Sequence, residues 1–232
     1  MARLRRMVLP GQVHVIVQRA PQDLTVFVDD RDRANYLLGL REAARGAGVA
    51  VHGYGLLAHE VRLLATPRDE PGLALMMQSV GRRFVRQINQ RHGRSGTVWE
   101  GRFRSAVIEA SPHFLACLRF VEGWSIGGSS VSASEDAPDS SAAYHLDGAK
   151  DPLIEPHPVY WHLGNTPFER EVRYREWLAQ PRTETELATI LRACMHGWVL
   201  GSEAFAAEAA ERSGRQSRPT TPGRPRGADK QI

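Results

Sequence analysis

Three polar residues interrupt an apolar stretch at residues 55–64, which reads GLLAHEVRLL. Side chains alternate along a strand, so Glu60 and Arg62 share one face while His59 lies on the other. Two ligands at this spacing could hold a metal ion, but a guanidinium offers no lone pair and tends to pair with a carboxylate instead. We therefore expect a catalytic position without an intact metal site, where Glu60 and Arg62 form only a weak surface contact.

A cluster of arginines lies further along, at residues 81–104, where seven arginines face one acid, Glu100. Arginines that displace condensed counterions give sequence-independent affinity for a phosphate backbone. Planar side chains among them could stack on unpaired bases. The candidate DNA-binding residues are Arg82, Arg83, Arg86, Arg91, Arg94, Trp99, Arg102, Phe103 and Arg104, with His92 as a further planar group. The alternatives are a solvated helix face for the arginines and core packing for Trp99 and Phe103.

The elements that must position these residues follow from the hydrophobic pattern. We expect strands at residues 12–18, 49–57, 60–65 and 98–109, and helices at residues 29–45, 73–90 and 111–121. This order is typical of a ferredoxin-like (RRM-like) α+β sandwich with an antiparallel sheet and packed helices. Further helices are expected at residues 167–179, at residues 184–194 and from residue 202.

Composition divides the 232 residues into four parts. Residues 1–124 hold the predicted sheet, and residues 125–150 are rich in serine and glycine, which predicts a flexible connector. Residues 151–212 form a helical C-terminal region. Residues 213–232 are rich in proline, glycine and arginine and should be a disordered basic tail. This tail has five basic residues and one acid, which equals the whole formal net charge of +4.

No run of residues approaches the roughly 18 consecutive apolar positions that a membrane span needs. The basic start is not followed by a long apolar segment, so no secretory leader is predicted and a cytoplasmic location is expected. The two cysteines, Cys117 and Cys194, have no metal-type spacing. We expect both to be reduced core thiols.

Several motifs, in order along nearly the whole chain, resemble those of the REP-associated tyrosine transposases. This is a branch of the HUH single-strand DNA transposases, within the insertion sequence 200-like family. The matching stretches include LPGQ at 9–12, MMQSVGRRFVR at 76–86, RHGRSGTVWEGRF at 91–103 and GWVLGSE at 197–203. The resemblance implies hairpin or single-stranded DNA as the partner, a divalent metal such as magnesium in active members, and a tyrosine that attacks DNA.

The catalytic motifs of that family are degenerate in this sequence. When the family's metal-binding strand is anchored on residues 63–64, its two histidine positions fall on Glu60 and Arg62. The nucleophilic tyrosine falls on Phe120, which lacks the hydroxyl that covalent catalysis requires. The resemblance therefore implies a DNA-binding protein that is catalytically inactive or domesticated, acts at the nucleoid, has no metal and has an oligomeric state that the sequence leaves open.

Two other interpretations stay open. The first is an active metal-dependent tyrosine transposase or nuclease with a relocated centre, using His52, His59 or Glu60 for metal and Tyr36 or Tyr54 as nucleophile. The second is a decayed protein or an interaction module. No Gly-Lys-Ser/Thr phosphate loop, His-Glu-x-x-His or Gly-x-Ser-x-Gly motif points to another enzyme.

Overall fold

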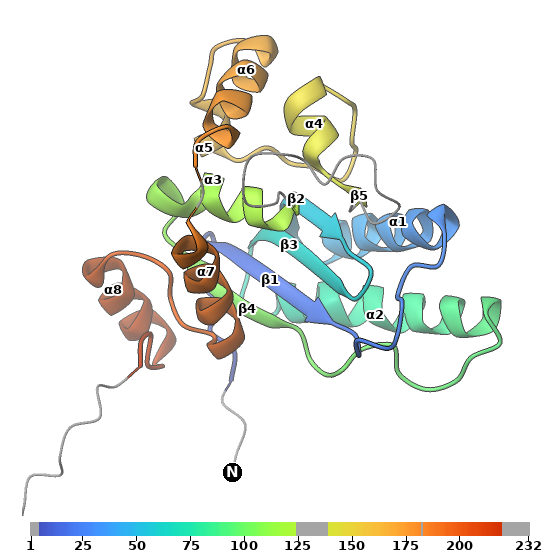
Figure 1. Ribbon diagram of the computed structural model, residues 1–232. Helices are drawn as coiled ribbons and strands as arrows, with labels where there is room; N and C mark the ends of the chain where they lie inside the picture. The colour runs from blue at the N-terminus through green and yellow to red at the C-terminus, as the bar shows by residue number, and fades with distance from the viewer. Residues whose placement is uncertain (1–4, 124–138, 182, 220–232) are drawn as a thin grey trace, which may run out of the picture.

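An antiparallel sheet forms the centre of the computed structural model, which describes residues 5–123, 139–181 and 183–219 (Figure 1). Its strands are β1 (Val13–Arg19), β2 (Val49–Leu56), β3 (Glu60–Pro67), β4 (Arg104–Ile108) and β5 (Asp139–Ser140). They lie in the order β4-β1-β3-β2-β5, and each neighbouring pair is antiparallel. The first four strands thus have the ferredoxin-like order, and the predicted fold class is confirmed.

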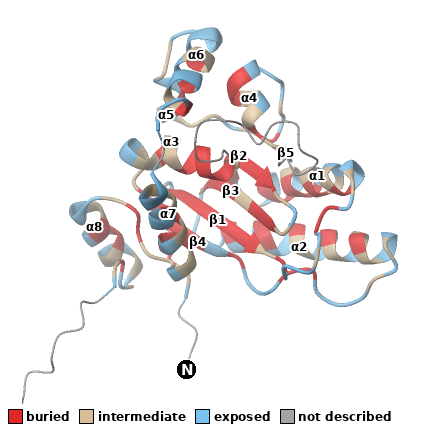
Figure 2. Cartoon of the chain, viewed as in Figure 1, coloured by how far each residue is buried: buried red, intermediate tan, exposed pale blue. Residues whose placement is uncertain are grey.

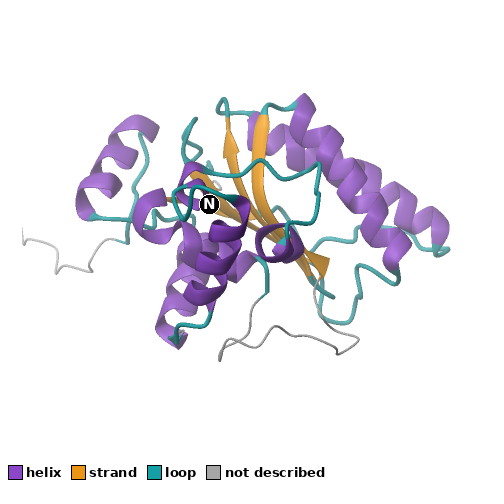
Figure 3. Ribbon diagram, turned by 90° about the horizontal axis from the view of Figure 1, so that it is seen from above, coloured by secondary structure: helices purple, strands orange, loops and turns teal. Residues whose placement is uncertain are grey.

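One face of the sheet is covered by α1 (Asp30–Gly46) and α2 (Gly72–Arg91), which form one of the two helix layers in Figure 3. Apolar residues recur every three or four positions along α2, which gives the helix one buried stripe. That stripe packs with Ile16, Leu63 and Ala65 of the sheet in one core cluster. We call this side of the sheet the α2 face.

The opposite face is covered by α3 (Ala110–Val121) and α7 (Glu184–His196), and we call it the α3 face. The strands between the two layers are almost continuously buried (Figure 2). Two glycines let α3 approach β2 closely. A Cβ at Gly55 would lie 2.1 Å from the carbonyl oxygen of Val121, and one at Gly53 would lie 2.5 Å from Leu118. This close approach fixes the last turn of α3 against the sheet.

The C-terminal region adds α4 (Ala142–Asp147), α5 (Pro158–Trp161), α6 (Pro167–Leu178) and α8 (Glu203–Ser213). A buried carboxylate just after α3, Glu122, joins several of these elements. It accepts hydrogen bonds from the hydroxyls of Ser141 and Tyr174, both at 2.8 Å, and contacts Nδ1 of His145 at 2.6 Å. This polar cluster therefore joins α4 and α6 to the end of α3.

Two predicted boundaries are wrong. The connector was expected to reach residue 150, but β5 pairs with the edge of β2 and α4 buries His145 and Leu146. The disordered tail was expected from residue 213, but Ser217 is buried and its carbonyl accepts from the amide of Val199 at 2.9 Å. Residues 124–138 and 220–232 of these two predicted segments lie outside the described residues.

Cys117 and Cys194 are free and buried, as predicted. In the described part of the chain, no helix combines the length and apolar character needed to cross a membrane.

Candidate nucleic-acid interface

The three positions that the sequence resemblance aligns with the family's catalytic residues lie together in space. Glu60 and Arg62 begin β3, and Phe120 lies on the last turn of α3. The Nε of Arg62 donates to Oε1 of Glu60 at 2.5 Å, and its Nη1 donates to the carbonyl oxygen of Phe120 at 2.9 Å. The same guanidinium lies 4.3 Å from the centre of the Phe120 ring, which is cation–π geometry.

Arg19 completes this group, because it is the cross-strand partner of Glu60 in the β1–β3 register. Its Nε donates to Oε2 of Glu60 at 2.5 Å, so each carboxylate oxygen accepts from a different guanidinium. Glu60 is only 8% exposed, so the expected weak surface contact is wrong. We call Arg19, Glu60, Arg62 and Phe120 the arginine–glutamate cluster.

The arginine–glutamate cluster does not fit a divalent metal. Its single carboxylate already accepts from two guanidiniums, and those two positive charges repel a cation. Across the described residues, no three or more histidine, cysteine, aspartate or glutamate side chains form a group that could hold a metal ion. Phe120 supplies an apolar ring where nucleophilic attack would need a hydroxyl.

The candidates for a relocated centre do not converge. A register shift in β2 between Val51 and Gly53 places His52 against Phe114 on the α3 face, whereas Tyr54 packs in the core of the α2 face. Both ring nitrogens of His52 have partners, the carbonyl of Glu155 at 2.6 Å and the hydroxyl of Thr66 at 2.8 Å. Burial lowers the pKa of His52 to about 4. The Tyr54 hydroxyl donates to Asp151 at 2.9 Å.

The other two candidates are also held by local structure. His59 lies in the turn before β3, where its Nδ1 contacts the carbonyl oxygen of Leu24 at 3.0 Å. Tyr36 is fully buried, and its ring packs on Phe27 and Phe84. Burial raises the pKa of its hydroxyl well above the usual value, which opposes formation of a phenolate nucleophile.

The predicted DNA-binding arginines divide between the two faces. Arg82, Arg83 and Arg86 line a groove between α1 and α2, on the α2 face, and Arg83 pairs with Glu42 there. Arg91 at the end of α2 pairs with Asp29 and Asp32, which cap the start of α1. Arg91 therefore links the end of α2 to the start of α1. The remaining arginines follow α2: Arg94 and Arg102 lie in the loop before β4, and Arg104 begins β4.

The predicted planar groups pack mainly within the fold, although Phe103 also lines the hollow described below. Trp99 is buried against Tyr36 and Phe84, and Phe103 is buried beneath the guanidinium of Arg6, 3.7 Å from its ring centre. His92 contacts Asp32, with 3.0 Å between Nε2 and Oδ2. This packing favours the alternative interpretation, in which Trp99 and Phe103 anchor the segment between α2 and β4 to the core.

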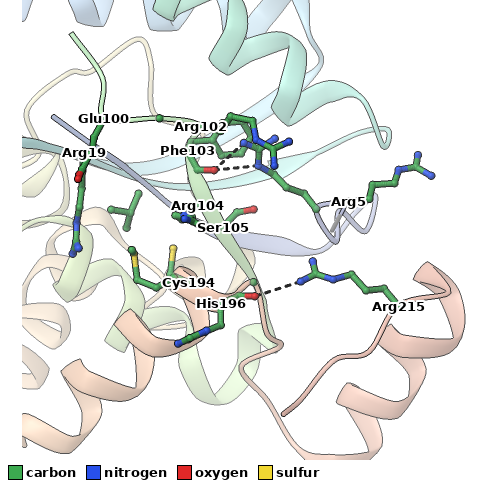
Figure 4. Close-up of a pocket in the computed structure, with 15 residues that line it drawn as sticks. Arg5, Arg19, Glu100, Arg102, Phe103, Arg104, Ser105, Cys194, His196 and Arg215 are labelled. Carbon is green, nitrogen blue, oxygen red and sulfur yellow. Dashed lines mark hydrogen bonds between the residues drawn. The ribbon is translucent and has the colours of Figure 1, made fainter. Parts of the chain in front are cut away.

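A hollow of about 580 Å³ adjoins the arginine–glutamate cluster (Figure 4). We call it the basic hollow; its polar lining includes Arg6, Arg19, Arg102, Arg104, His196 and Arg215. Val17 of β1 is the cross-strand partner of both Arg62 and Arg104, and directly paired residues share a face. The basic hollow and the cluster therefore lie on the same sheet face, and Arg19 belongs to both.

Positive charge in the basic hollow is largely uncompensated. Within the residues that the structure describes, no carboxylate forms an ion pair with Arg6, Arg102, Arg104 or Arg215. Burial, together with repulsion from Arg102 and Arg104, lowers the pKa of Arg6 to about 10. Sequence reasoning did not identify Arg6, Arg19 or Arg215 as site residues. The available signals were the basic segments at both ends of the chain and the pairing register of β1.

No protein-family model and no curated protein matches this sequence. Among solved structures, the chain is similar to a REP-associated tyrosine transposase bound to a REP hairpin, with a TM-score of 0.50 and 11% identity. That likeness covers 68% of this chain and 93% of the other. The chain therefore shares the fold of that transposase, and the resemblance seen in the sequence is confirmed at the level of the fold.

A second solved structure is described as a "putative transposase" from Deinococcus radiodurans R1. It is 18% identical and has a TM-score of 0.37, over 51% of this chain and 94% of the other. This likeness is too distant to carry an argument.

Proposed function

We propose that this chain is a member of the REP-associated tyrosine transposases that binds DNA but does not cleave it. The observation that carries the proposal is the arginine–glutamate cluster, in which the residues at both metal-ligand positions and at the nucleophile position contact one another. Strand cleavage by this family's chemistry needs a metal to polarise the phosphate and a hydroxyl to attack it. The cluster offers neither of these groups.

Retained positive charge supports DNA as the partner. The basic hollow lies beside the former catalytic positions, where the phosphate backbone of a bound strand would approach. The solved transposase with this fold is bound to a REP hairpin, which supports hairpin or single-stranded DNA as the ligand of this chain. Binding of this kind would place the protein at the nucleoid in the cytoplasm.

A binding and nicking experiment tests the proposal. A labelled DNA hairpin is titrated with the protein at increasing salt, with magnesium, with manganese and with EDTA. We expect binding that weakens steadily with salt, is unchanged by EDTA, and yields neither a nicked strand nor a protein–DNA adduct. Absence of binding at low salt would refute the DNA-binding role. A covalent adduct that disappears in Tyr36→Phe or Tyr54→Phe would instead establish a relocated active centre.

A further inference from the structure

The basic hollow is assembled from segments that are distant in the sequence. Arg5 and Arg6 come from the N-terminal segment, Arg102 lies just before β4, Arg104 begins β4, and Arg215 follows α8. Figure 4 labels Arg5, Arg102, Arg104 and Arg215 among the lining side chains. Arg215 is fixed there, because its Nη2 donates to the carbonyl oxygen of His196 at 3.3 Å. Arg6 is fixed by two hydrogen bonds to the carbonyl oxygen of Phe103, at 2.9 and 3.1 Å. Arg6 and Arg215 are thus held beside a common space that Arg102 and Arg104 also line.

Crowding of like charges in this space costs free energy unless an anion enters it. Acidic residues near the hollow do not remove the excess. Glu100 lines the hollow but forms no ion pair in the described structure, Glu60 is already shared by Arg19 and Arg62, and Glu70 pairs with Arg5. An anionic ligand with more than one charge would therefore gain most from binding.

The volume and the lining of the basic hollow limit which anions could bind there. A volume of about 580 Å³ lies within the range of roughly 300 to 1,000 Å³ that is typical of sites for compact ligands. Val17, Phe103 and Cys194 add an apolar portion to the lining. At its edge, the His196 ring stacks on Trp198 with 4.4 Å between ring centres. The lining thus combines guanidiniums for phosphate with apolar and planar surface for a sugar and a base.

We propose that the basic hollow binds the phosphorylated end of a nucleic-acid strand, as a terminal nucleotide with its phosphomonoester among Arg6, Arg102, Arg104 and Arg215. The proposal rests on the proposed function that the chain binds DNA. A terminal phosphomonoester carries nearly two negative charges at neutral pH, whereas an internal phosphodiester carries one. The crowded guanidiniums therefore favour a strand end over an uninterrupted backbone.

Fluorescence anisotropy with single strands of one sequence tests this site. The strands carry a 5′-phosphate, a 3′-phosphate or no terminal phosphate, and a circular strand serves as the form without ends. We expect one terminal phosphate to tighten binding about tenfold, as about one net charge-assisted hydrogen bond would give. Arg104→Gln should abolish this preference. Its matched control is Arg82→Gln, an arginine on the α2 face, which should leave the preference intact.

Each outcome decides a separate point. If all strands bind equally well and Arg104→Gln weakens them equally, the strand-end proposal is refuted while DNA binding stands. If no strand binds at low salt, the proposed function itself is refuted. In the last experiment, a nucleoside 5′-monophosphate is added as a competitor. Competition by it against only the phosphorylated strand supports the proposal, whereas Arg104-dependent binding of the mononucleotide without binding of any strand would overturn it in favour of a free nucleotide.

Discussion

The substitution Glu60→Gln should lower stability and raise DNA affinity at the same time. Glu60 holds the guanidiniums of Arg19 and Arg62 next to the basic hollow. Its side chain is 11% exposed, against 19% for Arg62 and 41% for Arg19. Glutamine keeps the shape of the side chain and removes its charge. The same substitution should therefore weaken the fold and strengthen DNA binding.

The stability loss can be bounded from the burial of the partners. Removing one member of a fully buried ion pair costs about 3–5 kcal/mol, whereas an exposed pair contributes about 0–1 kcal/mol. Arg19 reaches solvent and can be rehydrated, and the amide oxygen of the introduced glutamine could still accept from Arg62. We therefore expect the free energy of unfolding to fall by about 1–3 kcal/mol. Urea unfolding followed by tryptophan fluorescence measures this change.

The affinity gain follows from Coulomb's law. A negative charge about 10 Å from a bound phosphate opposes binding by about 1–2 kcal/mol at an effective dielectric constant of 20, and salt reduces this further. We expect Glu60→Gln to bind a labelled strand about three- to tenfold more tightly at low salt, with the advantage fading as salt increases. A purely structural role for Glu60 would give lower stability without tighter binding.

The matched control for this variant is Glu42→Gln. Glu42 also pairs with an arginine, Arg83, but on the α2 face, where both side chains reach solvent. It should change stability by less than about 1 kcal/mol and leave DNA affinity nearly unchanged. If Glu42→Gln tightened binding and Glu60→Gln did not, DNA would bind along α2, and the assignment of the interface to the α3 face would be refuted.

Three further predictions concern packing, pH and catalysis. Gly55→Ala should lower the free energy of unfolding by at least about 2 kcal/mol, because its Cβ would lie 2.1 Å from the Val121 oxygen; chemical denaturation measures this. His14 and His52 are buried with pKa values of about 4 against 6.5 when unfolded, so the unfolded state binds more protons between these values. Unfolding free energy, measured in urea at several pH values, should be highest above pH 6.5 and fall by about 3 kcal/mol per histidine as the pH drops to 4. The triple change Glu60→His, Arg62→His and Phe120→Tyr should restore manganese binding, measured by calorimetry, more readily than DNA nicking; efficient nicking by the unmodified protein would contradict this order.

The fold could be predicted because each element carries a strong local pattern. The apolar residues of α2 repeat every three or four positions, and β1 is a short β-branched run. Both patterns can be recognised from the sequence alone. The β2 bulge could not be foreseen, since it depends on how β2 pairs with β3 and not on the strand's own residues. That one-residue shift separates His52 from Tyr54, which strict alternation would place on one face.

Only some residues of the candidate site could be found from the sequence. Glu60, Arg62 and Phe120, which the resemblance aligns with the family's catalytic positions, lie in contact with one another. Arg19 and Arg6 were missed because their roles come from cross-strand register and from packing of a terminal segment on Phe103. Charge density alone could not separate arginines that pair within the fold, such as Arg91, from those that lack a carboxylate partner among the described residues.

The arginine–glutamate cluster also bears on whether this chain is a decayed transposase. Substitutions that accumulate independently at a former active site leave buried charges without partners, and each such charge is costly. Here the buried groups satisfy one another: Glu60 accepts from Arg19 and Arg62, and Arg62 lies over the Phe120 ring and donates to the main-chain carbonyl of the same residue. A tyrosine in place of Phe120 would bring a hydroxyl into a fully buried place beneath that guanidinium. Mutual satisfaction of this kind keeps the fold stable, so these contacts favour a maintained, folded protein over a decayed one.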